Sequence, residues 1–179
     1  MLEEFAVDNF KSLVDVRFRP SRVNLLLGAN NSGKSNFCHA MRFLSGTTRD
    51  PLQECVSRTA GSCGEIANHY RREEPTEFSV TASVPFNDAT WSFVYVLSIA
   101  WGDFNSGPPT LGVEKETLRV TGPGFHDVAL LRNSYGSVSL LDEVEYTPGQ
   151  EKYIDMSVPP GATMLNRVFD ADIHGRTHC

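Results

Sequence analysis

Eight residues near the N-terminus combine the residue types needed to hold phosphate groups. Residues 28–35 read Gly-Ala-Asn-Asn-Ser-Gly-Lys-Ser and match the pattern G-x-x-x-x-G-K-[ST] at every fixed position. Gly28 and Gly33 allow the backbone to take positive φ and to approach an anion closely. The N–H groups that lead into the following helix then converge on the anion, and the positive end of the helix dipole adds to the attraction. The pattern therefore predicts a phosphate-binding loop.

The last residues of this loop indicate which phosphates it would hold. Lys34 can reach the β- and γ-phosphate oxygens of a nucleoside triphosphate, and the Ser35 hydroxyl can bind Mg²⁺. We therefore expect ATP and Mg²⁺ as cofactors, with Ser35 as the metal ligand supplied by the protein. The residues expected to contact the nucleotide are Gly28, Asn30, Asn31, Ser32, Gly33, Lys34, Ser35 and Asn36.

The segments on either side of the loop have the patterns that such a loop requires. Residues 23–27 (Val-Asn-Leu-Leu-Leu) form a short apolar run, as expected of a strand buried on both faces. Residues 36–44 place apolar side chains at i, i+3, i+4 and i+7, the stripe of a helix that packs on a sheet. The order strand, loop, helix predicts an α/β arrangement around the loop.

The rest of the chain is rich in strand patterns. Residues 2–18 read as two short strands around a turn at residues 9–12, and a helix can run from Pro51 to about Arg58. Residues 162–169 can begin a further helix. Alternating apolar residues and turn signals predict strands at 78–84, 91–101, 113–120, 128–132, 137–146 and 153–158.

Net charge, apolar runs and cysteine spacing exclude several classes of protein. The formal net charge is −6 over 179 residues, which argues against nucleic-acid binding across the whole surface but is compatible with a local basic patch. The chain has no run of about 18 apolar residues and no apolar segment of secretory type at its start, so we expect no membrane span and a cytoplasmic location. The four cysteines fit no zinc-binding spacing and are expected to be reduced thiols.

The loop and its surroundings resemble a known group of ATPases. Residues 9–13 (Asn-Phe-Lys-Ser-Leu), followed by residues 23–36, are similar to the start of the ATPase heads of RecF, SMC and overcoming-lysogenisation-defect (OLD) proteins. More weakly, residues 113–118 look like a "v..E.L" segment of the predicted-ATPase branch of this group. Ala29 and Asn31 replace a common Pro and Gly, at positions whose side chains phosphate binding does not need.

This resemblance implies the N-terminal lobe of an ABC-type head. The implied fold class is α/β, a P-loop NTPase core with a substantial antiparallel β portion, incomplete at its C-terminus. The lobe would span residues 1–179: strands, loop and first helix in 1–46, an irregular or helical insert in 47–77, an antiparallel β region in 78–158, and the start of a truncated segment in 159–179.

The resemblance also implies partners and a setting. ATP would lie between two heads, so a homodimer or hetero-oligomer would form through the nucleotide face, with DNA or a nuclease as a further partner. Residues Phe10, Lys11 and Ser12 would lie near the base and ribose. The setting would be DNA repair or defence against phage and foreign DNA.

The residues needed to cleave ATP are not evident. Hydrolysis also requires a Walker B aspartate, a neighbouring base and a charge stabiliser, and no LSGGQ-like signature is found. Asp142 and Glu143 follow a short apolar run and are a weak Walker B candidate, because no signature helix precedes them. Gln53 and Gln150 are both candidates for the Q-loop. No catalytic residue is therefore assigned.

Two functions fit these observations, and a third is disfavoured. The leading hypothesis is an ATP-binding lobe whose hydrolysis needs a further lobe or a partner chain. The alternative is a non-hydrolysing nucleotide-binding module, in which ATP holds subunits together. A small self-contained P-loop kinase or GTPase is disfavoured, because its base-recognition motif and lid arginines are missing.

Overall fold

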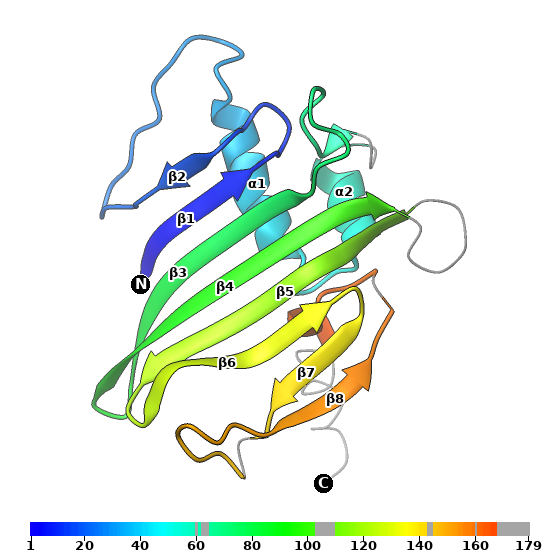
Figure 1. The fold of residues 1–179 in the computed structure, drawn as a ribbon. Helices are drawn as coiled ribbons and strands as arrows, with labels where there is room; N and C mark the ends of the chain where they lie inside the picture. Colours follow the sequence, from blue (N-terminus) through cyan, green and yellow to red (C-terminus); the bar gives the residue numbers. More distant parts are fainter. Residues whose placement is uncertain (60, 62–64, 103–109, 143–144, 160, 168–179) are drawn as a thin grey trace, which may run out of the picture.

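The chain folds around one antiparallel sheet with helices on one face (Figure 1). The structure is a computed structural model and describes residues 1–59, 61, 65–102, 110–142, 145–159 and 161–167. Its strand order is β2-β1-β3-β4-β5-β6-β7-β8, and each pair of neighbouring strands is antiparallel. The strands are β1 (Leu2–Asp8), β2 (Val16–Phe18), β3 (Thr76–Phe86), β4 (Ala89–Gly102), β5 (Thr110–Gly122), β6 (Phe125–Ser134), β7 (Ser137–Leu141) and β8 (Tyr153–Ser157).

Tight turns between consecutive strands produce this topology. Asn87 and Asp88 both have positive φ between β3 and β4, and Tyr135 and Gly136 have positive φ between β6 and β7. Two central residues of positive φ characterise the two-residue hairpin turn whose twist suits antiparallel strands. The chain therefore builds its long strands as a meander of hairpins.

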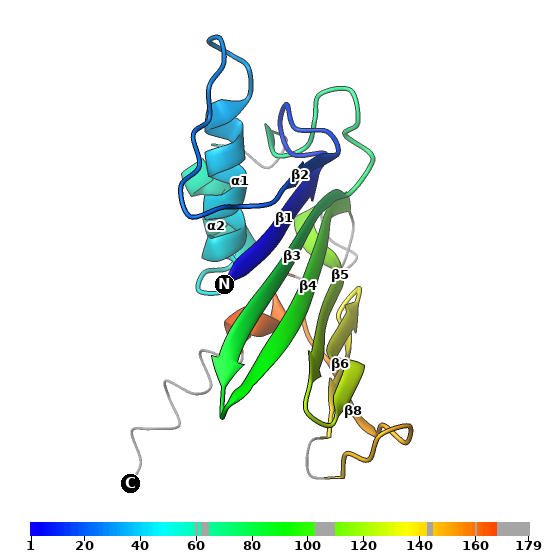
Figure 2. The ribbon, with the colours of Figure 1, turned by 90° about the vertical axis from the view of Figure 1, so that its left-hand side faces the viewer.

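Two helices cover the upper part of one face of the sheet (Figures 1 and 2). Helix α1 (Lys34–Gly46) follows the predicted phosphate loop, and α2 (Leu52–Thr59) packs beside it. Aromatic side chains dominate the core between α1 and the sheet: the ring of Phe43 stacks on Phe78 at 5.5 Å, and Phe37 meets Phe5 edge to face at 5.7 Å. This packing fixes the direction of α1 relative to the sheet.

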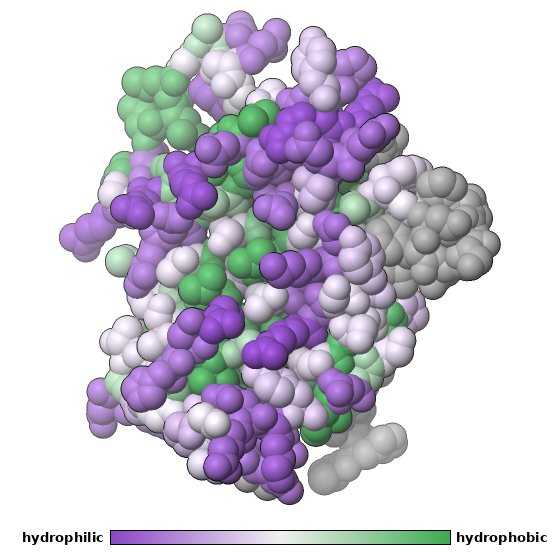
Figure 3. Space-filling model, in the orientation of Figure 1, coloured by the Kyte–Doolittle hydropathy of each residue, from purple (hydrophilic) through white to green (hydrophobic). Residues whose placement is uncertain are grey.

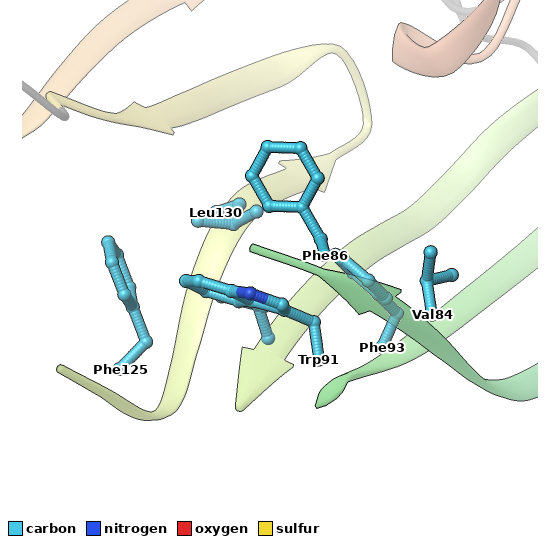
Figure 4. A pocket seen from close by; sticks show the side chains of 7 residues that line it. Val84, Phe86, Trp91, Phe93, Phe125 and Leu130 are labelled. Atoms are coloured by element: carbon cyan, nitrogen blue, oxygen red, sulfur yellow. The ribbon is translucent and has the colours of Figure 1, made fainter. Parts of the chain in front are cut away.

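Below the helices the same face of the sheet is apolar and open. The alternating positions that bury Phe78 and Leu97 continue along the β3–β4 pair to Val84 and Trp91. There a hollow of about 470 Å³ is lined by aromatic and aliphatic residues, which Figure 4 shows converging from neighbouring strands. The lining residues are Val84, Phe86, Trp91, Phe93, Val120, Phe125 and Leu130.

A buried carboxyl group attaches the C-terminal part of the described chain to the sheet. Glu116 on β5 is completely buried and accepts hydrogen bonds from the backbone N–H groups of Met164 (2.7 Å) and Leu165 (3.3 Å). Its oxygens also accept bonds from the Tyr95 hydroxyl and the Asn133 amide. Burial, followed by the adjacent Glu116, raises the pKa of Tyr95 well above its ordinary value.

The same segment is tied to the end of α1. The Thr163 hydroxyl donates to the carbonyl of Thr47, the C-cap of α1, at 2.7 Å, and both residues are fully buried. The backbone N–H of Leu52 donates to the carbonyl of Gly161 at 3.0 Å. Residues 161–167 thus connect both helices to β5.

The predicted fold class is wrong for the described chain. A P-loop NTPase core is built on a parallel sheet, whereas the pairings of this sheet are antiparallel. The difference includes residues 23–27, which were expected to form a strand buried on both faces and instead have no regular secondary structure. A strand of that kind needs hydrogen-bonded neighbouring strands and side chains packed over each face. In the described residues β1 pairs with β2 and β3 instead.

Most other elements agree with the sequence patterns. The helices predicted at 36–44 and 51–58 are confirmed as α1 and α2, and the predicted strands from 78 to 158 correspond to β3–β8. The run predicted at 137–146 ends as a strand at Leu141. The predicted helix start at 162–169 is observed at 164–167, and its last two residues lie outside the described residues.

Within the described residues, no helix is both long and apolar enough to cross a membrane.

Candidate phosphate-binding site

The predicted phosphate loop leads directly into α1 at the upper end of the molecule (Figure 1). Gly33 is the N-cap of α1 and has φ 91° and ψ −2°, a left-handed conformation that glycine adopts without strain. Asn31 also has positive φ, at 64°. The backbone conformation predicted for Gly33 from the motif is therefore present, whereas Gly28, for which the motif predicts it as well, does not have positive φ. The first N–H groups of α1 are left for an external acceptor.

Lys34 is folded into the loop. Its ammonium group donates to the carbonyl oxygens of Gly28 and Ala29, both at 2.6 Å, and to the Ser32 hydroxyl at 3.2 Å. Three oxygen atoms thus surround the cation at the centre of the loop. An incoming phosphate would offer stronger, charged acceptors to the same ammonium group.

The turn that follows β1 lies against this loop. The Asn36 amide donates to the Ser12 hydroxyl at 2.8 Å. A methyl group added at Gly33 would lie 3.3 Å from the same hydroxyl, so the two segments are closely apposed. Loop and turn together line an open hollow of about 730 Å³, within the usual size of small-molecule sites. The lining residues are Ser12, Asn30, Asn31, Ser32, Gly33, Lys34, Ser35 and Asn36.

The structure separates the three residues expected near the base and ribose. Ser12 lines the hollow, whereas Phe10 is completely buried in the aromatic core. Lys11 turns away from the loop and donates to the carbonyl of Thr59 at 2.6 Å. Burial lowers the pKa of Lys11, and nearby Glu65 opposes that shift. Only Ser12 of the three is therefore placed to contact a ligand in the hollow.

The weak catalytic candidates are remote from the loop. Asp142 follows β7, whose end lies at the bottom of the molecule, opposite the loop (Figures 1 and 2). Its backbone N–H donates to the carbonyl of Lys152, and its carboxyl group accepts from the N–H of Glu145. Glu143 lies outside the described residues. Gln53 on α2 and Gln150 in a turn do not line the hollow either.

No preformed metal centre is found in the described part of the chain, where no three His, Cys, Asp or Glu residues cluster. A magnesium ion at this loop would be bound by the Ser35 hydroxyl together with phosphate oxygens and water, as Mg²⁺ sites in nucleotide-binding loops are.

An exposed apolar segment leads into the loop. Val23, Leu25 and Leu27 are 85%, 77% and 80% exposed, and Leu26 is 42% exposed. Such contiguous exposed apolar residues mark an interaction site in a folded protein. The sequence pattern predicts that this segment is buried, whereas none of the described residues covers these side chains.

We expect Gly33→Ala to destabilise the loop. A left-handed conformation costs a residue with a Cβ about 1–2 kcal/mol, and the new methyl group would press on the Ser12 hydroxyl. Urea unfolding should therefore give a lower free energy of unfolding than wild type. Gly161→Ala, where an added methyl group meets no atom within 4 Å, is the matched control. Equal stability of the two variants would contradict the observed backbone conformation.

Comparison with known proteins does not identify a relative. A scan against protein-family models finds no match for the chain, and a search of curated proteins finds none that is significantly similar. The function is therefore inferred from the geometry of the loop.

Proposed function

We propose that this chain is a nucleotide-binding lobe that holds the phosphates of MgATP in the loop formed by residues 28–35. The observation that carries the proposal is the position of Lys34, whose ammonium group lies at the centre of the loop among three oxygen acceptors. Gly33 and the start of α1 add backbone N–H groups beside this cation. These are the elements by which a phosphate chain is held without covalent chemistry.

Binding by this lobe does not imply hydrolysis. The described residues place no acidic side chain in the lining of the hollow, and Asp142, which directly follows β7, is not part of that lining. We propose that cleavage of ATP needs groups from a further lobe or a second subunit. The alternative, a non-hydrolysing module in which ATP joins subunits, is supported by the same lining.

The exposed segment 23–27 supports the need for a further partner. Its apolar side chains lie beside the loop, where strands from another lobe or subunit would bury them. If a strand of the partner paired with this segment, the position of the loop would also be held, because residue 28 directly follows the segment. We propose that the nucleotide and this partner bind at neighbouring surfaces.

Competition binding tests the proposal. A fluorescent ATP analogue is titrated into the chain with Mg²⁺, and ATP, inorganic triphosphate and adenosine are added as competitors. Recognition through the phosphates predicts that ATP and triphosphate displace the analogue and adenosine does not. Displacement by adenosine alone would show that the loop is not the binding site.

We expect the double variant Leu25→Ser, Leu27→Ser to keep the stability of the wild type within about 0.5 kcal/mol, because both side chains are exposed. Leu44→Ser, on the buried side of α1, is the control and should cost about 2–5 kcal/mol. Urea unfolding followed by circular dichroism measures both. A large loss of stability in the double variant would mean that segment 23–27 is already packed.

A further inference from the structure

Strand β8 forms one edge of the sheet, and its outer side has no neighbouring strand among the described residues (Figure 1). Next to the strand, the N–H of Val158 donates to the carbonyl of Gly136 at 2.9 Å. Bonded pairs alternate in an antiparallel ladder, so every second residue of β8 bonds to β7. The N–H and C=O groups of Tyr153, Asp155 and Ser157 therefore point outwards and are open to a further strand.

The apolar surface of the sheet continues onto this edge strand. Ile154 and Met156 lie beside Leu140 and Val138 in the strand register, on the side of the sheet where Met164 packs. Val138 is completely buried there, whereas Ile154 and Met156 are 53% and 39% exposed. Apolar side chains of a further strand would lie directly beside these two residues and cover them.

The opposite face of β8 carries the only charge of the strand. Asp155 is exposed, accepts a hydrogen bond from the Ser139 hydroxyl at 2.5 Å, and forms no ion pair within the described residues. Arg132, on the same face two strands away, lies over the Tyr153 ring at 4.6 Å. Figure 3 views this face, where hydrophilic residues lie among smaller apolar areas. The Asp155 carboxyl group therefore has acceptor positions left for a cation on the next strand.

The two edges of the sheet differ in how they resist pairing. The other edge strand, β2, has three residues, and its central Arg17 is ion-paired with Glu4 and Asp15. Short edge strands that carry charge discourage the addition of a further strand. By contrast, β8 has five residues in unbroken register with β7 and contains no Pro and no Lys. Of the two edges, β8 is the one suited to pairing.

A second copy of this chain is disfavoured at the β8 edge. Two-fold antiparallel pairing through the outward-pointing groups joins Tyr153 to Ser157 and sets the two Asp155 side chains directly opposite each other. Like charges at directly opposed positions destabilise a strand pair. The formal net charge of −6 adds repulsion between two copies. A cation opposite Asp155 would turn this repulsion into attraction.

We propose that β8 is the docking edge for an extended basic strand of a protein partner. The partner strand pairs antiparallel to β8 and places Lys or Arg opposite Asp155. The residues on either side of this cation are apolar, because they lie beside Ile154 and Met156 on the other face. Backbone hydrogen bonds supply affinity in this mode of recognition, and the alternating side chains supply specificity. The proposal does not rest on nucleotide binding at residues 28–35.

A titration of the ¹⁵N-labelled chain with the peptide acetyl-Thr-Val-Lys-Val-Thr-amide tests the proposal. The amide signals of Tyr153, Asp155 and Ser157 should shift and saturate, whereas those of β2 at the other edge should not. A peptide with Glu in place of Lys should bind at least about threefold more weakly, because the cross-strand pair becomes repulsive. The variant Asp155→Lys should reverse this preference. Equal affinity for both peptides, or no binding of either, would overturn the proposal.

A second pair of peptides tests the backbone pairing on the wild-type chain alone. N-methylation of the central Lys removes a donor that faces β8 and should weaken binding by about tenfold. N-methylation of the following Val, whose N–H faces away from β8, is the matched control and should retain binding. Equal weakening by both modifications would show that the peptide does not pair with this edge.

Sedimentation of the chain without peptide or nucleotide tests the competing occupant. A dimer that Ile154→Lys dissociates would make a second copy the occupant of the edge and would overturn the assignment to a basic strand. Circular dichroism of Asp155→Lys and Ile154→Lys confirms that the fold is retained.

Discussion

Glu116→Ala is expected to lower the free energy of unfolding by about 3 kcal/mol or more, because several buried donors lose their acceptor at once. The Glu116 oxygens accept from two backbone N–H groups at residues 164 and 165, from the Tyr95 hydroxyl and from the Asn133 amide. Each unsatisfied buried donor costs about 1–3 kcal/mol. Urea unfolding followed by tryptophan fluorescence measures the loss.

The neighbouring residue Glu114 is the control for this prediction. It is partly exposed and bonded to the Ser98 and Tyr135 hydroxyl groups. Its replacement by alanine leaves one buried donor, the Ser98 hydroxyl, without this acceptor and should cost about 1–3 kcal/mol, less than the loss of Glu116. If both variants were equally stable, the buried network around Glu116 would not attach residues 161–167 to the sheet.

Lys34→Ala is expected to weaken MgATP binding by about tenfold to a hundredfold. A hydrogen bond to a charged group contributes about 1.5–3 kcal/mol, and about 1.4 kcal/mol corresponds to a tenfold change in affinity. The displacement assay with the fluorescent analogue measures the change. Lys152→Ala, directly before β8 and outside the lining of the hollow, makes the same change in net charge and should retain wild-type affinity. Wild-type affinity in Lys34→Ala would contradict the role of this side chain.

Local patterns predicted most of the secondary structure because short-range physics determines those elements. The apolar spacing of residues 36–44 predicted α1, and the alternation in residues 78–84 predicted β3. Both are observed because their apolar side chains find partners within the described chain, as the contact between Phe43 and Phe78 shows.

Whether residues 23–27 form a strand could not be predicted from the local sequence pattern. Its composition suits a strand buried on both faces, but pairing depends on neighbours that the local sequence does not contain. In the structure those apolar side chains are exposed, and the neighbouring strands of the sheet pair in antiparallel fashion without this segment. The predicted α/β core was therefore wrong although the segment patterns around it were largely right.

The candidate site was predictable at Gly33 and the start of α1, and less so in the segment that enters the loop and in its side-chain contacts. The motif anticipated the left-handed conformation of Gly33 and the start of α1 beside Lys34. The contact between Ser12 and Asn36 and the outward turn of Lys11 depend on long-range packing between β1, α1 and α2. Such contacts between distant segments leave no periodic signal in the sequence.

Amide resonances of the ¹⁵N-labelled chain during a titration with MgATP report on phosphate binding residue by residue. Binding at the loop predicts that the signals of Gly28, Gly33, Lys34 and Ser35 shift together and saturate, whereas those of β7 and β8 stay in place. Adenosine should leave the loop signals unchanged. Saturable shifts confined to other parts of the sheet, with the loop unaffected, would contradict nucleotide binding at residues 28–35.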